Sequence, residues 1–261
     1  MDEFSFSDVD AGDSRAAIDY LDAVSRISVA DKDRTFAIQR LAPGMRVLDI
    51  GCGTGDDVRT IAEIVGQEGR VTGIDPSRTL IDEASSRGVS SNARFEVASA
   101  NALPFDDASF DAVRAERVFQ HLNDADSAAR EMKRVLAPGG SALLLDQDWD
   151  TLMISGGERS LTTRIVRALA DHVVNPWAGR EAAGLLCRAG FADVEVLPSI
   201  GTPTFSLAAQ SILRPAMQAA VQANVVDART ADQWLQSLLE ADLRREFFCG
   251  VVVIVALGRV A

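Results

Sequence analysis

The middle of the chain alternates short apolar stretches with amphipathic ones, a pattern typical of a parallel sheet covered by helices on both faces. Five strands are predicted over residues 45–51, 70–75, 93–99, 110–116 and 141–148. Helices are predicted between them over residues 56–67, 77–87 and 124–137. The last of these ends before a Pro-Gly-Gly turn at residues 138–140.

The pattern differs on both sides of this alternating region. Apolar positions recur at helical spacing from Ser14 to Leu41 and predict two helices. After residue 148 we expect further helices and two strands, over residues 157–173, 179–189, 193–199 (strand), 206–223, 230–246 and 247–259 (strand). We expect the long last strand to lie inside the sheet, and we interpret the outlying helices as a lid over the carboxyl ends of the strands.

Charge and composition exclude several classes of protein. The chain has 261 residues with 38 acidic and 26 basic side chains, and therefore a net charge of −12. This charge argues against a protein that binds nucleic acid without sequence preference. The longest apolar run, 247–257, is too short to cross a bilayer, and the acidic N-terminus lacks a signal-peptide pattern. We therefore expect a cytoplasmic protein. Three widely separated cysteines predict neither a disulfide framework nor a zinc site.

A glycine-rich turn, VLDIGCGTG at residues 47–55, joins a buried strand to a helix. Glycines there let the backbone approach a ligand closely, and the helix N-terminus offers unpaired N–H groups. The spacing is not the G-x-G-x-x-G of dinucleotide sites. Asp49 could hold an ammonium group, and Asp75, at the end of the second strand, could accept both hydroxyls of a ribose. These two features fit S-adenosylmethionine better than NAD.

Four motifs lie in this region: VLDIGCGTG (47–55), GIDPS (73–77), ALPFDDASFDAV (102–113) and EMKRVLAPGG (131–140). With this combination the chain resembles the class I S-adenosylmethionine-dependent methyltransferases, in particular their small-molecule, UbiE-like (methyltransferase type 11) group. The resemblance is strong over about residues 40–148. It implies a doubly wound α/β fold, Rossmann-like, with a seven-stranded, mainly parallel sheet in the order 3-2-1-4-5-7-6, the last strand antiparallel, and a helical lid.

The resemblance also implies how the cofactor is held at its methionine end. Asp49, Gly51, Gly53 and Gly55 would line that end. Tyr20, the only tyrosine, would pack over the cofactor, and core packing is the alternative.

The resemblance assigns the ribose and the adenine to the following segments. Asp75 would bind the ribose and Pro76 would flank the adenine. Where the family commonly has an acidic residue and then a small one, this chain has Ser99 and Ala100. Asn101 is the neighbouring polar residue that would then contact the adenine amino group.

Two segments that follow the fourth and fifth strands hold the candidate groups for methyl transfer. Glu116 and Arg117 would pair with each other or face the cofactor carboxylate. His121 is a candidate general base, since an imidazole titrates near neutrality. Related O-methyltransferases place a histidine here with an acidic partner after the fifth strand, so Asp146 or Asp148 would orient it. A histidine that only caps a short helix is the alternative.

We therefore expect one domain over residues 1–261. Its parts are an N-terminal helical cap (1–40), a cofactor-binding core (41–148) and lid helices (149–190 and 203–246). By analogy with the family, it would transfer a methyl group from S-adenosylmethionine to a small-molecule acceptor by in-line displacement, yielding S-adenosylhomocysteine. The expected nucleophile is a hydroxyl oxygen of a specialised metabolite.

Several alternatives stay open at this stage. They are N- or C-methylation of a small molecule, and a cofactor-binding cyclase or regulatory protein without methyl transfer. No metal site, nucleic acid or membrane partner is expected, and a homodimer is left open.

Overall fold

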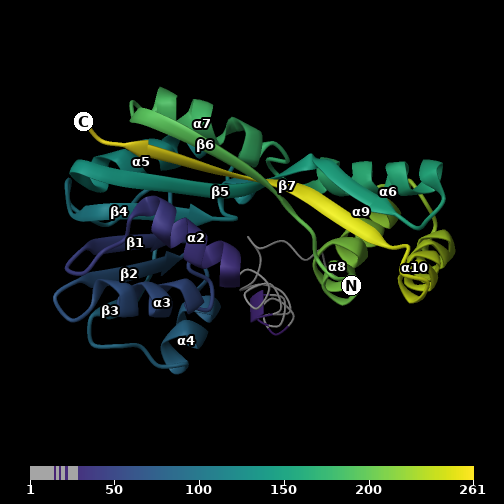
Figure 1. Ribbon diagram of the computed structural model, residues 1–261, viewed down its shortest axis with the longest axis horizontal. Coiled ribbons are helices and arrows are strands. Elements are labelled where there is room, and N and C mark those ends of the chain that lie inside the picture. The colour runs from purple at the N-terminus through teal and green to yellow at the C-terminus, as the bar shows by residue number, and fades with distance from the viewer. Residues whose placement is uncertain (1–14, 16–17, 19–20, 23–28) are drawn as a thin grey trace.

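Seven strands form one sheet in the order β3-β2-β1-β4-β5-β7-β6, in which β7 runs antiparallel to both of its neighbours (Figure 1). The computed structural model describes residues 15, 18, 21–22 and 29–261. Its strands are β1 (Arg46–Ile50), β2 (Arg70–Asp75), β3 (Ala93–Val97), β4 (Phe110–Glu116), β5 (Leu136–Ser155), β6 (Ala192–Gly201) and β7 (Phe248–Arg259). The predicted fold class, strand order and antiparallel last strand are confirmed, and β7 lies inside the sheet as expected.

Helices cover both faces of this sheet. α2 (Val29–Gln39) and α3 (Asp56–Val65) pack on one face, where Phe36 and Ile61 join a hydrophobic core with β1 and β2. α5 (Ala125–Val135) and α7 (Ala178–Arg188) pack on the other, around Met132 and Leu186. The remaining elements are α4 (Arg78–Ser86), η2 (Phe119–His121), α6 (Arg159–His172), α8 (Phe205–Ala208), η3 (Ala209–Leu213), α9 (Arg214–Gln222) and α10 (Ala228–Leu243).

Beyond the main sheet, β5 and β7 continue as a two-stranded extension, paired from Met153↔Gly250 to Ser155↔Phe248. α6, α8, η3, α9 and α10 pack around this extension and form a helical lobe with its own hydrophobic core (Figure 1). Trp149 from β5, Val251 from β7 and Trp234 from α10 lie in that core. β5 therefore runs seven residues further than predicted, because Trp149 and Leu152 of its far part are buried against the lobe.

Two details of the predicted lid differ from the structure. The range 149–190 includes α7, but Ala182 and Leu186 of α7 pack in the main core beside β5 and β7. The predicted helix over residues 206–223 is divided into α8, the π-helical η3 and α9. The wider turn precedes Pro215, which has no N–H to donate to a preceding carbonyl.

Candidate active site

A cavity of about 220 Å³, the first cavity, lies at the carboxyl ends of β1, β2 and β4. Such a position is where doubly wound sheets bind their ligands. Its polar lining is mainly acidic, and apolar side chains complete the wall. The charged lining residues are Asp49, Asp56, Asp57, Asp75, Glu116 and Arg117.

The glycine-rich turn forms one wall of the first cavity. Gly51 and Gly53 line it with φ of 68° and 53°, left-handed values that favour glycine. Gly55 has the same kind of conformation but does not line the cavity. A Cβ atom on Gly55 would stand 2.4 Å from Cζ of Phe95. Gly55 thus permits α3 to pack against β3, which differs from its predicted place at the methionine end.

Asp75 ties the end of β2 to the glycine turn. Its nearly buried carboxylate accepts hydrogen bonds from the N–H groups of Gly53 (3.1 Å) and Ser77 (2.9 Å). Both of its oxygens are thereby fixed in the cavity wall. The geometry suits a group that receives ribose hydroxyls.

The predicted adenine segment is divided. Pro76, Ser99 and Ala100 line the first cavity, whereas Asn101 does not. The amide of Asn101 instead donates to the carbonyl oxygen of Asp124 at 2.6 Å. Apolar side chains that the sequence did not single out complete this part of the wall. They are Leu21, Leu80, Ala98, Val118 and Leu122.

A buried arginine on β4 organises the acidic end of the first cavity. The Arg114 guanidinium is fully buried and stacks over the Phe36 ring, 4.5 Å from its centroid. It forms ion pairs with Glu116 (3.1 Å), Asp57 (3.3 Å) and Asp49 (3.6 Å). Three carboxylates are thereby gathered at one end of the first cavity. Their negative charges fit a ligand with sulfonium and ammonium groups, because opposite charges attract strongly where water is excluded.

The turn after β4 holds the expected Glu116–Arg117 pair, with 3.4 Å between a guanidinium nitrogen of Arg117 and Oε1 of Glu116. Arg117 has a φ of 58°, and its N–H donates to the Leu145 carbonyl oxygen at 2.6 Å. It is the one cationic side chain lining the first cavity among the described residues. The guanidinium is therefore available to a carboxylate ligand only in competition with Glu116.

His121 lines the first cavity as a neutral imidazole. Burial, together with the positive charge of Arg117, lowers the pKa of His121 to about 4. The Trp149 indole donates to Oε1 of Gln120 at 2.7 Å, so the amide nitrogen of Gln120 must be the atom 3.2 Å from Nε2 of His121. Since an amide nitrogen only donates, Nε2 accepts and the proton is on Nδ1. An imidazole in this state is a weaker base than expected.

Asp146 and Asp148 do not line the first cavity, and their side chains contact η2 and α7 instead. Asp146 is fully buried and accepts hydrogen bonds from the N–H groups of Phe119 (3.2 Å) and Gln120 (3.3 Å). Burial raises the pKa of Asp146 to about 8. Asp148 forms a two-bond ion pair with Arg180 of α7. Their hydrogen bonds therefore position η2 and α7, and the predicted role of orienting the His121 imidazole is wrong for both.

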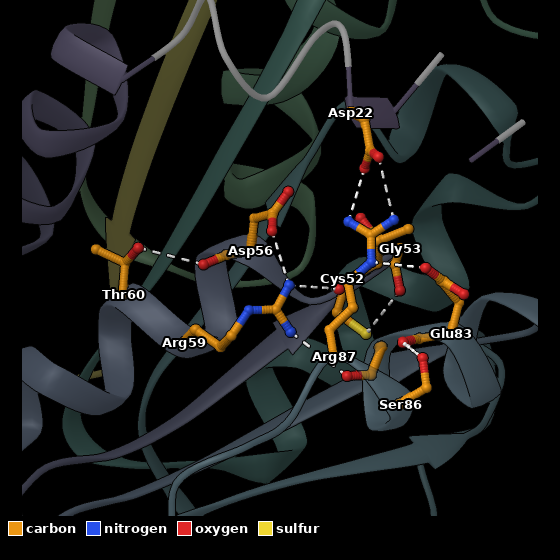
Figure 2. A network of polar contacts seen from close by, with 11 residues as sticks. Asp22, Cys52, Gly53, Asp56, Arg59, Thr60, Glu83, Ser86 and Arg87 are labelled. Atoms are coloured by element: carbon orange, nitrogen blue, oxygen red, sulfur yellow. Dashed lines mark hydrogen bonds and ion pairs between the residues drawn. The ribbon is translucent and has the colours of Figure 1, made fainter. Parts of the chain in front are cut away.

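Two arginines, Arg87 and Arg59, do not line the first cavity but bind residues that line or adjoin it, a region that we call the rim (Figure 2). Arg87, which follows α4 directly, forms ion pairs with Asp22 of the N-terminal segment (2.7 Å) and Glu83 (2.8 Å). Arg59 of α3 donates to the Thr54 carbonyl oxygen and to Asp56, each at 2.7 Å. Asp22 follows Leu21, which lines the cavity, so Arg87 fastens that stretch beside the opening. Tyr20, predicted to cover the cofactor, lies outside the described residues.

A second cavity of about 300 Å³ adjoins the first, and Glu116 and Arg117 line both. It is bounded by β5, β6, β7, η3 and α2, and its wall is largely apolar. Most of its lining residues follow residue 144, including Leu145, Gln147, Trp149, Leu197, Ile212 and Val253. Side chains alternate across a strand, so Leu145 and Gln147 face this cavity, whereas Asp146 faces η2 and Asp148 faces α7.

Comparisons with known proteins identify relatives of this chain. Residues 47–140 match the model of a family described as a methyltransferase domain. The chain is 32% identical over 248 residues to an uncharacterized 37.1 kDa protein in transposon Tn4556 of Streptomyces fradiae, covering 93% of this chain and 71% of that protein. It is 38% identical over 108 residues to the ubiquinone/menaquinone biosynthesis C-methyltransferase UbiE of Shewanella sediminis, covering 40% of this chain but only 43% of that enzyme.

Among solved structures, the YcgJ protein from Bacillus subtilis has the same fold, with a TM-score of 0.61 and 20% identity over 88% of this chain and 97% of that one. In the part of the chain that the structure describes, no helix is long and apolar enough to cross a membrane. The motifs, the sheet order and the relatives agree on one assignment. The chain belongs to the class I S-adenosylmethionine-dependent methyltransferases.

Proposed function

We propose that this protein transfers the methyl group of S-adenosylmethionine to a small-molecule acceptor. The observation that carries the proposal is the first cavity, in which a glycine turn, the fixed Asp75 carboxylate and an acidic cluster around Arg114 lie together. Bound S-adenosylmethionine supplies an electrophilic methyl group on a positively charged sulfur. The chain's own residues bind that molecule, orient it and exclude water from it.

Each part of the first cavity has a separate task in this proposal. Asp75 receives the ribose hydroxyls, and Pro76 with Ala100 packs beside the adenine. Asp49 and the neighbouring carboxylates offset the positive charges of the methionine end. Arg117, held by Glu116, faces the boundary between the two cavities and receives a carboxylate or an acceptor oxygen.

For the methylated atom, we propose a hydroxyl oxygen of a specialised metabolite, with carbon as the second candidate. Methylation of oxygen with His121 as the base requires this residue to face the cavity, and it does line the first cavity. Its lowered pKa, however, makes it a weak base near neutrality. An acceptor with an acidic hydroxyl, such as a phenol or an enol, needs little help to ionise. Its anion is nucleophilic at oxygen and at the adjacent carbon, and the UbiE relatives are named as C-methyltransferases.

Calorimetric titration with S-adenosylhomocysteine tests the cofactor site. The wild type should bind, and Asp75→Asn should weaken binding about tenfold or more, because hydrogen bonds to a charged partner contribute about 1.5–3 kcal/mol. Asp232→Asn, at an exposed position on α10, is the matched control and should bind normally. A wild type that does not bind S-adenosylhomocysteine would refute the proposal.

Product analysis on a panel of phenols and enols decides the methylated atom. If oxygen is methylated with His121 as the base, His121→Gln should lower kcat by about 10² or more. A ring-methylated product whose rate survives His121→Gln would move the assignment to carbon.

A further inference from the structure

We propose that the second cavity is the acceptor site and that Gln147 is its specificity-determining residue, selecting an uncharged, mainly apolar molecule that carries a hydroxyl group. This inference rests on the proposed function and names the acceptor's chemical class. Glu116 and Arg117 form a wall that the two cavities share, because they line the first cavity on one side and the second cavity on the other. A molecule in the second cavity therefore lies next to the place where the methyl group would be presented.

The wall of the second cavity indicates an apolar occupant of one or two rings. Leu145, Leu197, Val253 and Val255 line it from the sheet, and Ile212 lines it from η3. A volume of about 300 Å³ is at the small end of the range for small-molecule sites. Binding of such a molecule would remove the apolar wall of the cavity from contact with water, and this removal is the main source of affinity in sites of this kind.

The charges around the second cavity argue against a charged occupant. Glu116 and Arg117 are paired with each other at the shared wall. Arg34 of α2 is the other charged side chain in the lining, and it is exposed. An ionic acceptor would have to leave water for a wall that is mostly hydrocarbon, which is costly without a buried partner.

Gln147 is the polar group that the second cavity leaves unsatisfied. Its Oε1 atom is buried and has no hydrogen-bond partner among the residues that the structure describes. A buried carbonyl oxygen without a partner is unfavourable, but this atom has almost no accessible surface, so a donor on a ligand reaches it only after the amide rotates. The two ends of an amide exchange by rotation about its last torsion angle, which is broad. A hydroxyl, which both donates and accepts, can pair with either end.

Equilibrium dialysis of the full chain tests the inference, with 1-naphthol and naphthalene as probes that differ only in the hydroxyl. In the presence of saturating S-adenosylhomocysteine, the wild type should bind 1-naphthol about fivefold more tightly than naphthalene. Gln147→Leu should abolish this preference, while Gln233→Leu, at an exposed position on α10, should keep it. Ser199→Trp, which adds a large side chain to the lining, should weaken binding of both probes tenfold or more.

Three results would overturn the inference without touching the proposed function. They are failure of the wild type to bind 1-naphthol, displacement of 1-naphthol by S-adenosylhomocysteine, and an unchanged hydroxyl preference in Gln147→Leu. The titration with S-adenosylhomocysteine alone tests the cofactor site independently of the acceptor site, so it distinguishes failure of one proposal from failure of the other. If that titration succeeds and the naphthol experiment fails, the cofactor site stands and the acceptor site does not.

Discussion

Replacing Gly55 with alanine should destabilise the protein while leaving the cofactor affinity of the folded fraction unchanged. The residue has a φ of 82°, and an added Cβ would stand 2.4 and 2.7 Å from two ring atoms of Phe95. Left-handed backbone costs a non-glycine residue about 1–2 kcal/mol. Overpacking adds about 1–3 kcal/mol. The free energy of unfolding should therefore fall by about 2–5 kcal/mol, and Tm by roughly 5–15 °C.

A double-mutant cycle with Phe95→Leu separates the two contributions. The smaller leucine removes the contacting ring atoms, so Gly55→Ala in that background should cost only the backbone contribution of about 1–2 kcal/mol. Urea unfolding measures the four free energies, and titration with S-adenosylhomocysteine gives the affinity of each folded protein. A stable Gly55→Ala protein that has lost its affinity would refute the reasoning, because Gly55 would then face the ligand.

Two further predictions concern the rim and the buried carboxyl group. Arg87→Gln should weaken S-adenosylhomocysteine binding less than about fivefold, because the ion pair of Arg87 with Asp22 is partly exposed. Arg94→Gln, on β3 away from the cavity, is the control and should have no effect on binding. Equal effects of the two substitutions would contradict the role of the rim. The pKa of Asp146, raised to about 8, means that folding favours its protonated form, so stability is lost as pH rises toward 8. From pH 6.5 to 8, the free energy of unfolding should fall by about 1–2 kcal/mol, although His121, which loses its proton near pH 6.5 in the unfolded chain, opposes this fall by a few tenths of a kcal/mol. Asp146→Asn should remove this fall, measured by urea unfolding, and a parallel fall in the variant would contradict the assignment.

The sheet and its glycine turn were predictable because their signals are local. A buried strand, a glycine turn and an acidic residue at the end of the next strand occur within residues 47–75. The family motifs supplied the strand order, which no local pattern contains. Gly51, Gly53 and Asp75 of this stretch line the first cavity, and so does Pro76, whose place the family resemblance implied.

The second half of the candidate site was not predictable, because it depends on which face of β5 each residue occupies. β5 is buried on both sides, so its apolar pattern does not distinguish Gln147 from Asp146 and Asp148. The carboxylates of Asp146 and Asp148 were predicted to be functional because of their chemistry, yet the neutral amide of Gln147 between them is the side chain that lines the second cavity. The tautomer of His121 depends on Trp149, 28 residues away in the chain, through Gln120.

The order in which the two cavities are lined along the chain has an evolutionary consequence. The first cavity is formed by residues up to 122, and most of the second by residues after 144. The match to the methyltransferase family ends at residue 140, between these two sets. A single genetic crossover in this interval would combine an inherited cofactor site with a new acceptor wall. Point mutations in the later half would likewise change the wall of the second cavity while leaving the cofactor-binding segment unaltered.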